Sequence, residues 1–463
     1  MNSENINKVH PNPKVAVVGG GPAGLMAADK LSQAGVQVHL FDAMPSVGRK
    51  FLLAGRGGLN LTHSEPLAQF QQRFGASEAW VTPWLAQWGP DQVRQWALSL
   101  GVATFVGTSG RVFPVDFKAA PLLRNWLQHL RHAPVPVQFH MRHRWTGWGA
   151  SGNTLVFETP AGTTEFFADA VVLALGGASW PRLGSNGAWV ELLGQHGVPI
   201  SPLQSANCGF DLAQLWSPLF ANKFAGQPFK SVALRVAHGA QVLERKGEFV
   251  ATATGVEGSL IYAASALLRQ QINATGQATL ELDLLPDFSA QKVLQEVGTP
   301  RGSKSTSNHL KSRLGLQGIK HALLLELLTK AQYQDTALLA QAIKALPITL
   351  ARTRPLAEAI STAGGVQASG LNPGLMLKNW PGVFCAGEML DWDAPTGGYL
   401  LTACLASGVQ AAQSVQAFLA EHGQCGISRR ALTPALAWQL GLLGSPPDPV
   451  GRFPMREGPS APL

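Results

Sequence analysis

The chain has 463 residues, 46% of them hydrophobic, and a formal net charge of +8. At about 150 residues per domain, this length predicts two or three domains with a sizeable core. No apolar run approaches the about 20 residues of a membrane span, and residues 1–14 lack the apolar stretch of a secretory signal. Because the four cysteines show no close pairing, we expect no disulfide framework and a cytoplasmic protein with no membrane contact.

A glycine-rich turn follows the first apolar stretch of the chain. Residues 15–18 predict a strand, and residues 25–28 predict a helix beyond the turn. In the G-x-G-x-x-G pattern between them, the first glycine permits the turn and the second lets backbone approach a pyrophosphate. The third allows close helix packing, and the helix N-terminus attracts phosphate. The residues expected to bind a dinucleotide here are Gly19, Gly21, Pro22, Ala23 and Gly24.

An acidic residue stands where such a site needs one. Residues 36–41 predict a second strand, and Asp42 ends it. A carboxylate about 20 residues after the glycine turn accepts hydrogen bonds from the ribose hydroxyls of a dinucleotide. Position and chemistry agree, so the sequence predicts a ribose-binding strand–helix–strand unit.

The next segments mix expected loops and helices. Residues 48–63 are rich in glycine, which predicts a cofactor-contacting loop rather than a helix. Four tryptophans between Trp80 and Trp96 recur at helical spacing, which is typical of helix packing. Residues 107–114 predict a second tight loop, and residues 121–131 predict a helix.

The middle of the chain changes character twice. Residues 135–167 alternate like a meander of short strands, and the apolar stretch 170–177 returns the chain to the main sheet, with Gly176 against the cofactor.

We expect one α/β, Rossmann-like FAD/NAD(P)-binding domain in two sequence pieces, with an inserted β-rich domain and a small helical domain. The pieces are 1–200 and 351–420, the insertion (β-barrel-like, then helical) is 201–350, and 421–463 is a C-terminal tail.

The C-terminal part carries the features that select FAD among dinucleotides. Residues 381–388 predict an apolar strand that ends in an Ala-Gly-acid pattern at Gly387 and Glu388, where flavoproteins bind the ribityl chain. Gly397 and Gly398 precede a predicted helix whose N-terminus would stabilise the charge of a reduced flavin.

The remaining cofactor predictions follow from FAD. We expect Arg49 and Lys50 near its pyrophosphate or flavin, and Gly57 against it. No second G-x-G-x-x-G follows a strand, which disfavours a dedicated nicotinamide domain but allows NAD(P)H as a transient reductant. We expect no metal, because no ligand spacing suits one, and no C-x-x-C redox pair is present.

These motifs together resemble the BaiN/YhiN-type flavoproteins, also known as the aminoacetone oxidase family of FAD-binding enzymes. The resemblance implies an FAD domain in two pieces, with a β-rich and then helical insertion. The matching motifs are Gly-Gly-Gly-Pro-Ala-Gly at 19–24, Gly-Arg-Lys at 48–50, Gly-Arg-Val-Phe-Pro at 110–114, Leu-Gly-Gly-Ala-Ser-Trp-Pro at 175–181, Thr-Ala-Gly-Gly-Val at 362–366, Ala-Gly-Glu at 386–388 and Thr-Gly-Gly-Tyr at 396–399.

The chain departs from the family pattern in one loop. Where many members carry Gly-Gly-Gly-Arg-Cys-Asn, this chain has Gly58 at the arginine and Leu59 at the cysteine. Leu400 also stands where many members have Asn. The chain is therefore similar to a distinct subgroup that lacks the Gly-Arg-Cys-Asn motif, and a proton-donor role of that cysteine does not carry over.

The resemblance implies reduction of an electron-poor C=C bond by hydride from flavin N5. The substrate would be a small-molecule enone, or a uridine of large-subunit ribosomal RNA converted to dihydrouridine. Residues 118–144 and 301–320 contain basic side chains and no acid, which fits either solvated faces or a polyanion such as RNA. Two alternatives remain, namely an FAD-dependent amine (aminoacetone-like) oxidase and a non-catalytic flavin-bound RNA or ribosome factor.

Few residues qualify as catalytic groups. Tyr399, in the loop expected at the flavin edge, could donate a proton or pack on the ring. His63 could act as an acid or be a solvated loop residue, and Asp391 and Asp393 could bind a polar substrate or simply be surface charges. We take Tyr399 and His63 as the catalytic candidates.

Overall fold

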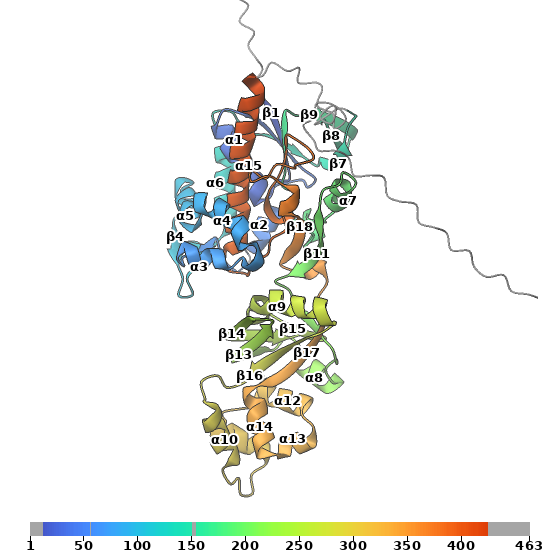
Figure 1. Ribbon diagram of the computed structural model, residues 1–463. Helices are drawn as coiled ribbons and strands as arrows, with labels where there is room; N and C mark the ends of the chain where they lie inside the picture. Colours follow the sequence, from blue (N-terminus) through green and yellow to red (C-terminus); the bar gives the residue numbers. More distant parts are fainter. Residues whose placement is uncertain (1–12, 56, 151–153, 425–463) are drawn as a thin grey trace, which may run out of the picture.

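The computed structural model describes residues 13–55, 57–150 and 154–424. The expected C-terminal tail lies outside these residues from position 425 onward. Figure 1 shows a sheet-and-helix domain at one end of the molecule and a barrel with helices at the other. The antiparallel pair β11 (Ile200–Ala206) and β18 (Ser361–Val366) connects the two.

A five-stranded sheet of order β19-β10-β1-β2-β6 forms the first domain, and all of its strands run parallel. Parallel strands need crossovers, which here bring segments far apart in sequence to the same edge of the sheet. The second piece of the chain thereby pairs with the first, as the two-piece Rossmann-like prediction required. The strands are β1 (Lys14–Val18), β2 (Gln37–Asp42), β6 (Gln138–Met141), β10 (Ala170–Leu173) and β19 (Val383–Cys385).

Both faces of this sheet are covered. Along β1, Val15 and Val17 belong to a core shared with three helices, whereas Ala16 and Val18 belong to a core shared with a small sheet. This alternation follows from the period of two along a strand. The helices are α1 (Pro22–Gln33), α6 (Ala119–Arg131) and α15 (Tyr399–Gln424), and the small sheet consists of β7 (Arg144–Trp148), β8 (Thr154–Thr159) and β9 (Gly162–Phe167).

The insertion is a closed six-stranded barrel of order β12-β15-β14-β13-β16-β17, and its helices lie between these strands in the chain. Its own apolar core lies inside the barrel and under the helices. The strands are β12 (Phe210–Leu212), β13 (Pro228–His238), β14 (Gln241–Ala251), β15 (Gly255–Glu257), β16 (Ala278–Asp283) and β17 (Leu346–Thr353). The helices are α8 (Pro218–Phe224), α9 (Ser259–Thr275), α10 (Ala290–Gly298), α11 (Thr306–Leu314), α12 (Gly318–Leu327), α13 (Lys330–Gln334) and α14 (Thr336–Lys344).

Two expected loops contain regular structure instead. Residues 48–63 include the helix α2 (Arg49–Ala54) and the strand β3 (Thr62–His63). The loop prediction was wrong because the glycines flank the helix rather than interrupt it: Gly48 precedes it with a φ of +69° and Gly55 follows it. Similarly, the 107–114 loop is the turn and second strand of a hairpin.

The remaining elements complete the first domain. Trp80 and Trp84 lie in α4 and Trp96 lies in α5, as the spacing predicted, whereas Trp88 stands between the two helices. None of the described helices is long and apolar enough to cross a membrane. These elements are β4 (Thr104–Val106), β5 (Arg111–Pro114), α3 (Leu67–Gln72), α4 (Glu78–Gln87), α5 (Pro90–Ser99), α7 (Trp189–Gly194) and the short 3-10 turns Gly75–Ser77, Pro181–Leu183, Leu356–Glu358, Ala368–Gly370 and Gly387–Met389.

The packing of α1 on the glycine turn generates a stability prediction. A Cβ atom at Gly24 would lie 1.9 Å from the carbonyl oxygen of Gly19, which is backbone and cannot easily move. We expect Gly24→Ala to lower the free energy of unfolding by about 3 kcal/mol, measured by chemical denaturation without cofactor. Gly194→Ala is the matched control, because a Cβ there meets nothing within 4 Å. Equal stability of the two variants would contradict the packing argument.

Candidate functional site

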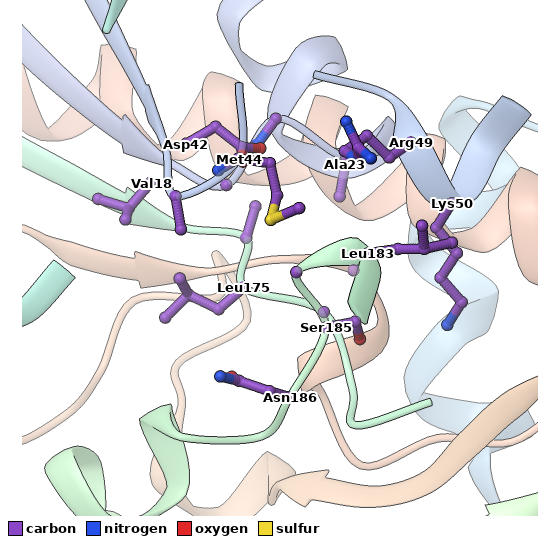
Figure 2. A pocket seen from close by; sticks show the side chains of 18 of the residues that line it. Val18, Ala23, Asp42, Met44, Arg49, Lys50, Leu175, Leu183, Ser185 and Asn186 are labelled. Atoms are coloured by element: carbon purple, nitrogen blue, oxygen red, sulfur yellow. The ribbon is translucent and has the colours of Figure 1, made fainter. Parts of the chain in front are cut away.

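A cavity of about 370 Å³ opens at the edge where β1, β2 and β10 end. Ligands of open parallel sheets bind at this edge, beyond the carboxyl ends of the strands. Figure 2 shows Asp42 and Met44 on one side, Arg49 and Lys50 on another, and Ser185 and Asn186 from the segment after β10. Ten sequence-predicted residues line the cavity, namely Gly19, Gly21, Pro22, Ala23, Asp42, Arg49, Lys50, Gly176, Gly387 and Glu388.

The three glycines of the turn have different surroundings. Gly19 has a φ of +107°, a conformation that favours glycine, and its added Cβ would strike the carbonyl of Ala174 at 2.2 Å. Gly24 contacts Gly19 closely and lies inside α1 rather than on the cavity wall. At Gly21, by contrast, a Cβ would meet nothing within 4 Å. The free space in front of Gly21 is therefore room for a ligand.

The Asp42 carboxylate is fixed at the end of β2. Oδ2 accepts a hydrogen bond from the Gly20 N–H and Oδ1 accepts one from the Met44 N–H, each at 2.8 Å. Burial raises the pKa of Asp42 above its usual value, against the effect of these two N–H groups, which favour the charged form. Each oxygen keeps a second lone pair, so both can still accept a ribose hydroxyl.

Lys50 and Glu388 join the two sequence pieces of the domain. Lys50 Nζ donates to Glu388 Oε2 at 2.5 Å and to Ser179 Oγ at 2.6 Å. The Glu388 Oε1 atom accepts from the Thr362 N–H at 3.0 Å. The ion pair is largely buried, with side chains 28% and 12% exposed. This arrangement places one cation and one anion at the same corner of the cavity.

Ser179 and Thr362 were not predicted as site residues. Besides the contacts above, Thr362 Oγ1 accepts hydrogen bonds from the backbone N–H groups of Ala178 and Ser179, at 2.9 and 3.2 Å. Both residues lie in motifs that carried the family resemblance, at 175–181 and 362–366. These motifs could have pointed to Ser179 and Thr362 as site residues, but the sequence does not show that the two residues contact each other.

Two polar side-chain atoms and one helix N-terminus at the cavity suit the binding of FAD. Arg49 Nε and Ser185 Oγ are buried at the cavity and have no hydrogen-bond partner among the described residues. Helix α1 begins with Pro22 after Gly21, which has no side chain to cap the helix. Its first N–H groups therefore remain available to phosphate. Unsatisfied donors and free backbone N–H groups are what a pyrophosphate requires.

Besides Gly24, three predicted cofactor residues lie outside the cavity lining. Gly57 is exposed, with a φ of +84° and no neighbour within 4 Å of an added Cβ. Gly397 and Gly398 have φ values of +134° and +94° at the start of α15. A Cβ at Gly398 would lie 2.4 Å from the Cα of Thr62, so close packing on β3 by itself requires glycine there.

Tyr399 is buried and contacts the partly exposed His63. Their rings stack with centroids 5.4 Å apart. Burial and the hydrogen-bonded Glu65 carboxylate raise the pKa of Tyr399 well above its usual value. Although burial acts in the opposite direction, hydrogen bonds from Arg73 and Tyr399 hold the pKa of Glu65 below its usual value. The Tyr399 hydroxyl is therefore protonated at neutral pH and lies beside an anion.

The His63 ring already has two backbone partners. Its Nδ1 atom accepts from the Glu65 N–H, and its Nε2 atom is 3.1 Å from the carbonyl oxygen of Ser109.

Leu59, which replaces the cysteine common in the resembling family, is buried in the apolar core. Asp391 accepts a hydrogen bond from Ser201, and Asp393 accepts one from Arg269. Among the described residues, no three His, Cys, Asp or Glu side chains gather to hold a metal ion.

Comparison with known proteins identifies the family of the chain. Residues 13–414 match the family model of the HI0933-like protein Rossmann domain. The chain is 27% identical to the 3-dehydro-bile acid delta(4,6)-reductase of Clostridium scindens, over 87% of this chain and 98% of the relative. It is 24% identical to the ribosomal RNA dihydrouridine synthase of Escherichia coli K12, over 83% of this chain and 93% of the relative.

The chain is also similar in structure to the open conformation of a flavocytochrome c3 fumarate reductase, with a TM-score of 0.47 and 15% sequence identity. The match covers 88% of this chain and 78% of the reductase chain. That likeness is too distant to bear on function. The family match and the reductase relative support FAD as the cofactor and oxidoreductase as the class. The chain belongs to the HI0933-like family of Rossmann-domain proteins.

Proposed function

We propose that this FAD-dependent oxidoreductase reduces an electron-poor C=C bond of a small-molecule enone, with NAD(P)H as the reductant. The observation that carries the proposal is the cavity at the strand ends, where the predicted FAD-binding residues of both sequence pieces meet at the Lys50–Glu388 pair. The full-length similarity to a bile acid reductase supports an enone as the substrate class.

Different residues of this chain would bind different parts of the cofactor. Gly21 and the N-terminus of α1 would receive the pyrophosphate, and Asp42 would accept the ribose hydroxyls. Glu388, held by Lys50, would bind the ribityl chain. When bound, FAD would supply the hydride that the β-carbon of the enone receives. Tyr399 is the proposed proton donor to the α-carbon, because it begins α15 directly after Gly397 and Gly398, in the segment expected at the flavin edge.

A second candidate substrate is a uridine of ribosomal RNA. The side chains of Lys118, Arg124 and Arg131 are exposed, as a phosphate-binding surface requires. In the 301–320 stretch, however, two of the basic groups have internal partners. Arg313 pairs with Glu296, and Lys320 donates to the carbonyls of Ser231 and Leu284. The second stretch therefore offers less free positive charge than the sequence indicated.

The free space at Gly21 generates a binding prediction. In Gly21→Ala, the added methyl group meets no protein atom but occupies the space where the pyrophosphate would approach. We expect the FAD dissociation constant to rise by about tenfold or more, with unchanged stability of the cofactor-free protein. Flavin fluorescence titration and thermal unfolding measure the two effects. Wild-type affinity in this variant would show that the pyrophosphate lies elsewhere.

Turnover with defined substrates tests the proposed function. Under anaerobic conditions, NAD(P)H should bleach the visible flavin band, and a 3-dehydro bile acid with conjugated C=C bonds should restore it. Mass spectrometry should find product carrying one added hydride and one added proton. Loss of uridine from ribosomal RNA fragments without enone reduction would favour the second candidate. Hydrogen peroxide release with amines under air would indicate an oxidase, and a flavin that never turns over would indicate a non-catalytic factor.

The proton-donor role of Tyr399 is tested separately. We expect Tyr399→Phe to lower enone turnover by about 100-fold, because general acid catalysis contributes on this scale, while NAD(P)H still reduces the flavin. Tyr333→Phe is the control, since Tyr333 lies in the helices of the insertion and contacts His321 at 2.7 Å. Turnover within twofold of wild type in Tyr399→Phe would assign the ring a packing role only.

A further inference from the structure

The segment 391–398, between the 3-10 turn Gly387–Met389 and α15, is defined here as the flavin-edge loop. It ends in Gly397 and Gly398, whose positive φ values lead into α15. The loop contains no helix or strand of its own. Within the sheet domain, the Asp391 N–H donates to the carbonyl of Val366 on β18, and Trp392 is buried in the apolar core. The other partners of the loop lie on the insertion and on the strand that leads to it.

Arg269 reaches the loop from the barrel. It lies on α9, and its guanidinium donates to Asp393 Oδ2 at 2.6 Å and to the backbone carbonyl of Ser205 at 3.1 Å. Only 8% of Arg269 is exposed. A charge buried to this extent needs a partner, and losing one member of such a pair leaves the other uncompensated. The Asp393 carboxylate is thereby held at one position relative to α9.

Asn207, which directly follows β11, binds the loop backbone on both sides of Pro395. Its Nδ2 donates to the Ala394 carbonyl at 2.8 Å, and its Oδ1 accepts from the Thr396 N–H at 3.1 Å. The residue is 2% exposed and has a φ of +49°, a left-handed conformation that asparagine tolerates better than most residues. Ser201 on β11 adds a hydrogen bond to Asp391 Oδ2 at 2.5 Å.

The element that carries Arg269 is fixed to the barrel. Leu260, Ile261 and Leu268 of α9 belong to the apolar core inside the barrel. Figure 1 shows α9 at the end of the barrel nearest the sheet domain. Since the barrel core is close-packed, Arg269 moves only with the barrel as a whole.

We propose that Arg269 and Asn207 are positioning residues of the flavin site: the insertion holds the flavin-edge loop and so sets where the N-terminus of α15 points. This inference rests on the proposed function, because it requires that FAD bind at this site. The partial positive charge of the helix N-terminus stabilises a reduced flavin only in the right place and direction. Displacing the loop would therefore make the flavin harder to reduce.

The test removes the ion pair and measures the flavin rather than activity alone. Arg269→Met keeps side-chain length but not charge, and Asp393→Asn removes the other partner. Arg235→Ala is the matched control, since it breaks a barrel ion pair with Glu281 whose side chains are 48% and 47% exposed. Each protein is loaded with FAD, and its midpoint potential is measured by anaerobic reductive titration, alongside thermal unfolding and turnover.

We expect a more negative midpoint potential and an at least tenfold lower turnover in Arg269→Met and Asp393→Asn, with wild-type values in the control. Arg269→Met that folds, binds FAD and keeps the wild-type potential would overturn the proposal. If Arg269→Met does not fold, Asp393→Asn decides by the same criterion. A wild-type protein that takes up no flavin would instead overturn the proposed function, and this inference with it.

Discussion

The buried Glu388 carboxylate is the contact on which the two-piece domain depends. It accepts hydrogen bonds from Lys50 on α2 and from the backbone N–H of Thr362 on β18. The Gly177 N–H after β10 lies 3.4 Å from the same carboxylate. A carboxylate that is 12% exposed requires such partners, because an unpaired buried charge is costly. One charge thereby fixes segments from three distant parts of the chain at one corner of the cavity.

The parallel sheet is what brings these segments together. The strands β1, β10 and β19 are hydrogen-bonded neighbours although more than three hundred residues separate the first from the last. Their carboxyl ends share one edge, so the loops that follow them meet there. Glycines at this edge then allow close approach, as Gly387 does toward Ala23 of α1. The strand order and the absence of side chains at these points together shape the cavity.

The insertion interrupts the domain without separating its pieces, because the antiparallel β11–β18 pair closes the chain again before the last part of the domain. This route places α9 and the end of β11 beside the flavin-edge loop. A barrel inserted at another point in the chain would leave Asp393 and Ala394 without Arg269 and Asn207 as partners. The point of insertion therefore matters for the site as well as for the fold.

The sequence by itself determined the local elements whose signal is short-range. The glycine turn, Asp42 at the end of β2 and the apolar strand before Glu388 were all predictable, because each depends on residues within one strand or turn. Residues 48–63 were misjudged because composition averages over glycines that in fact flank α2. Only the tertiary structure decided which side chains meet. The Lys50–Glu388 pair spans 338 positions and the Arg269–Asp393 pair spans 124, and no local pattern encodes contacts at such separations.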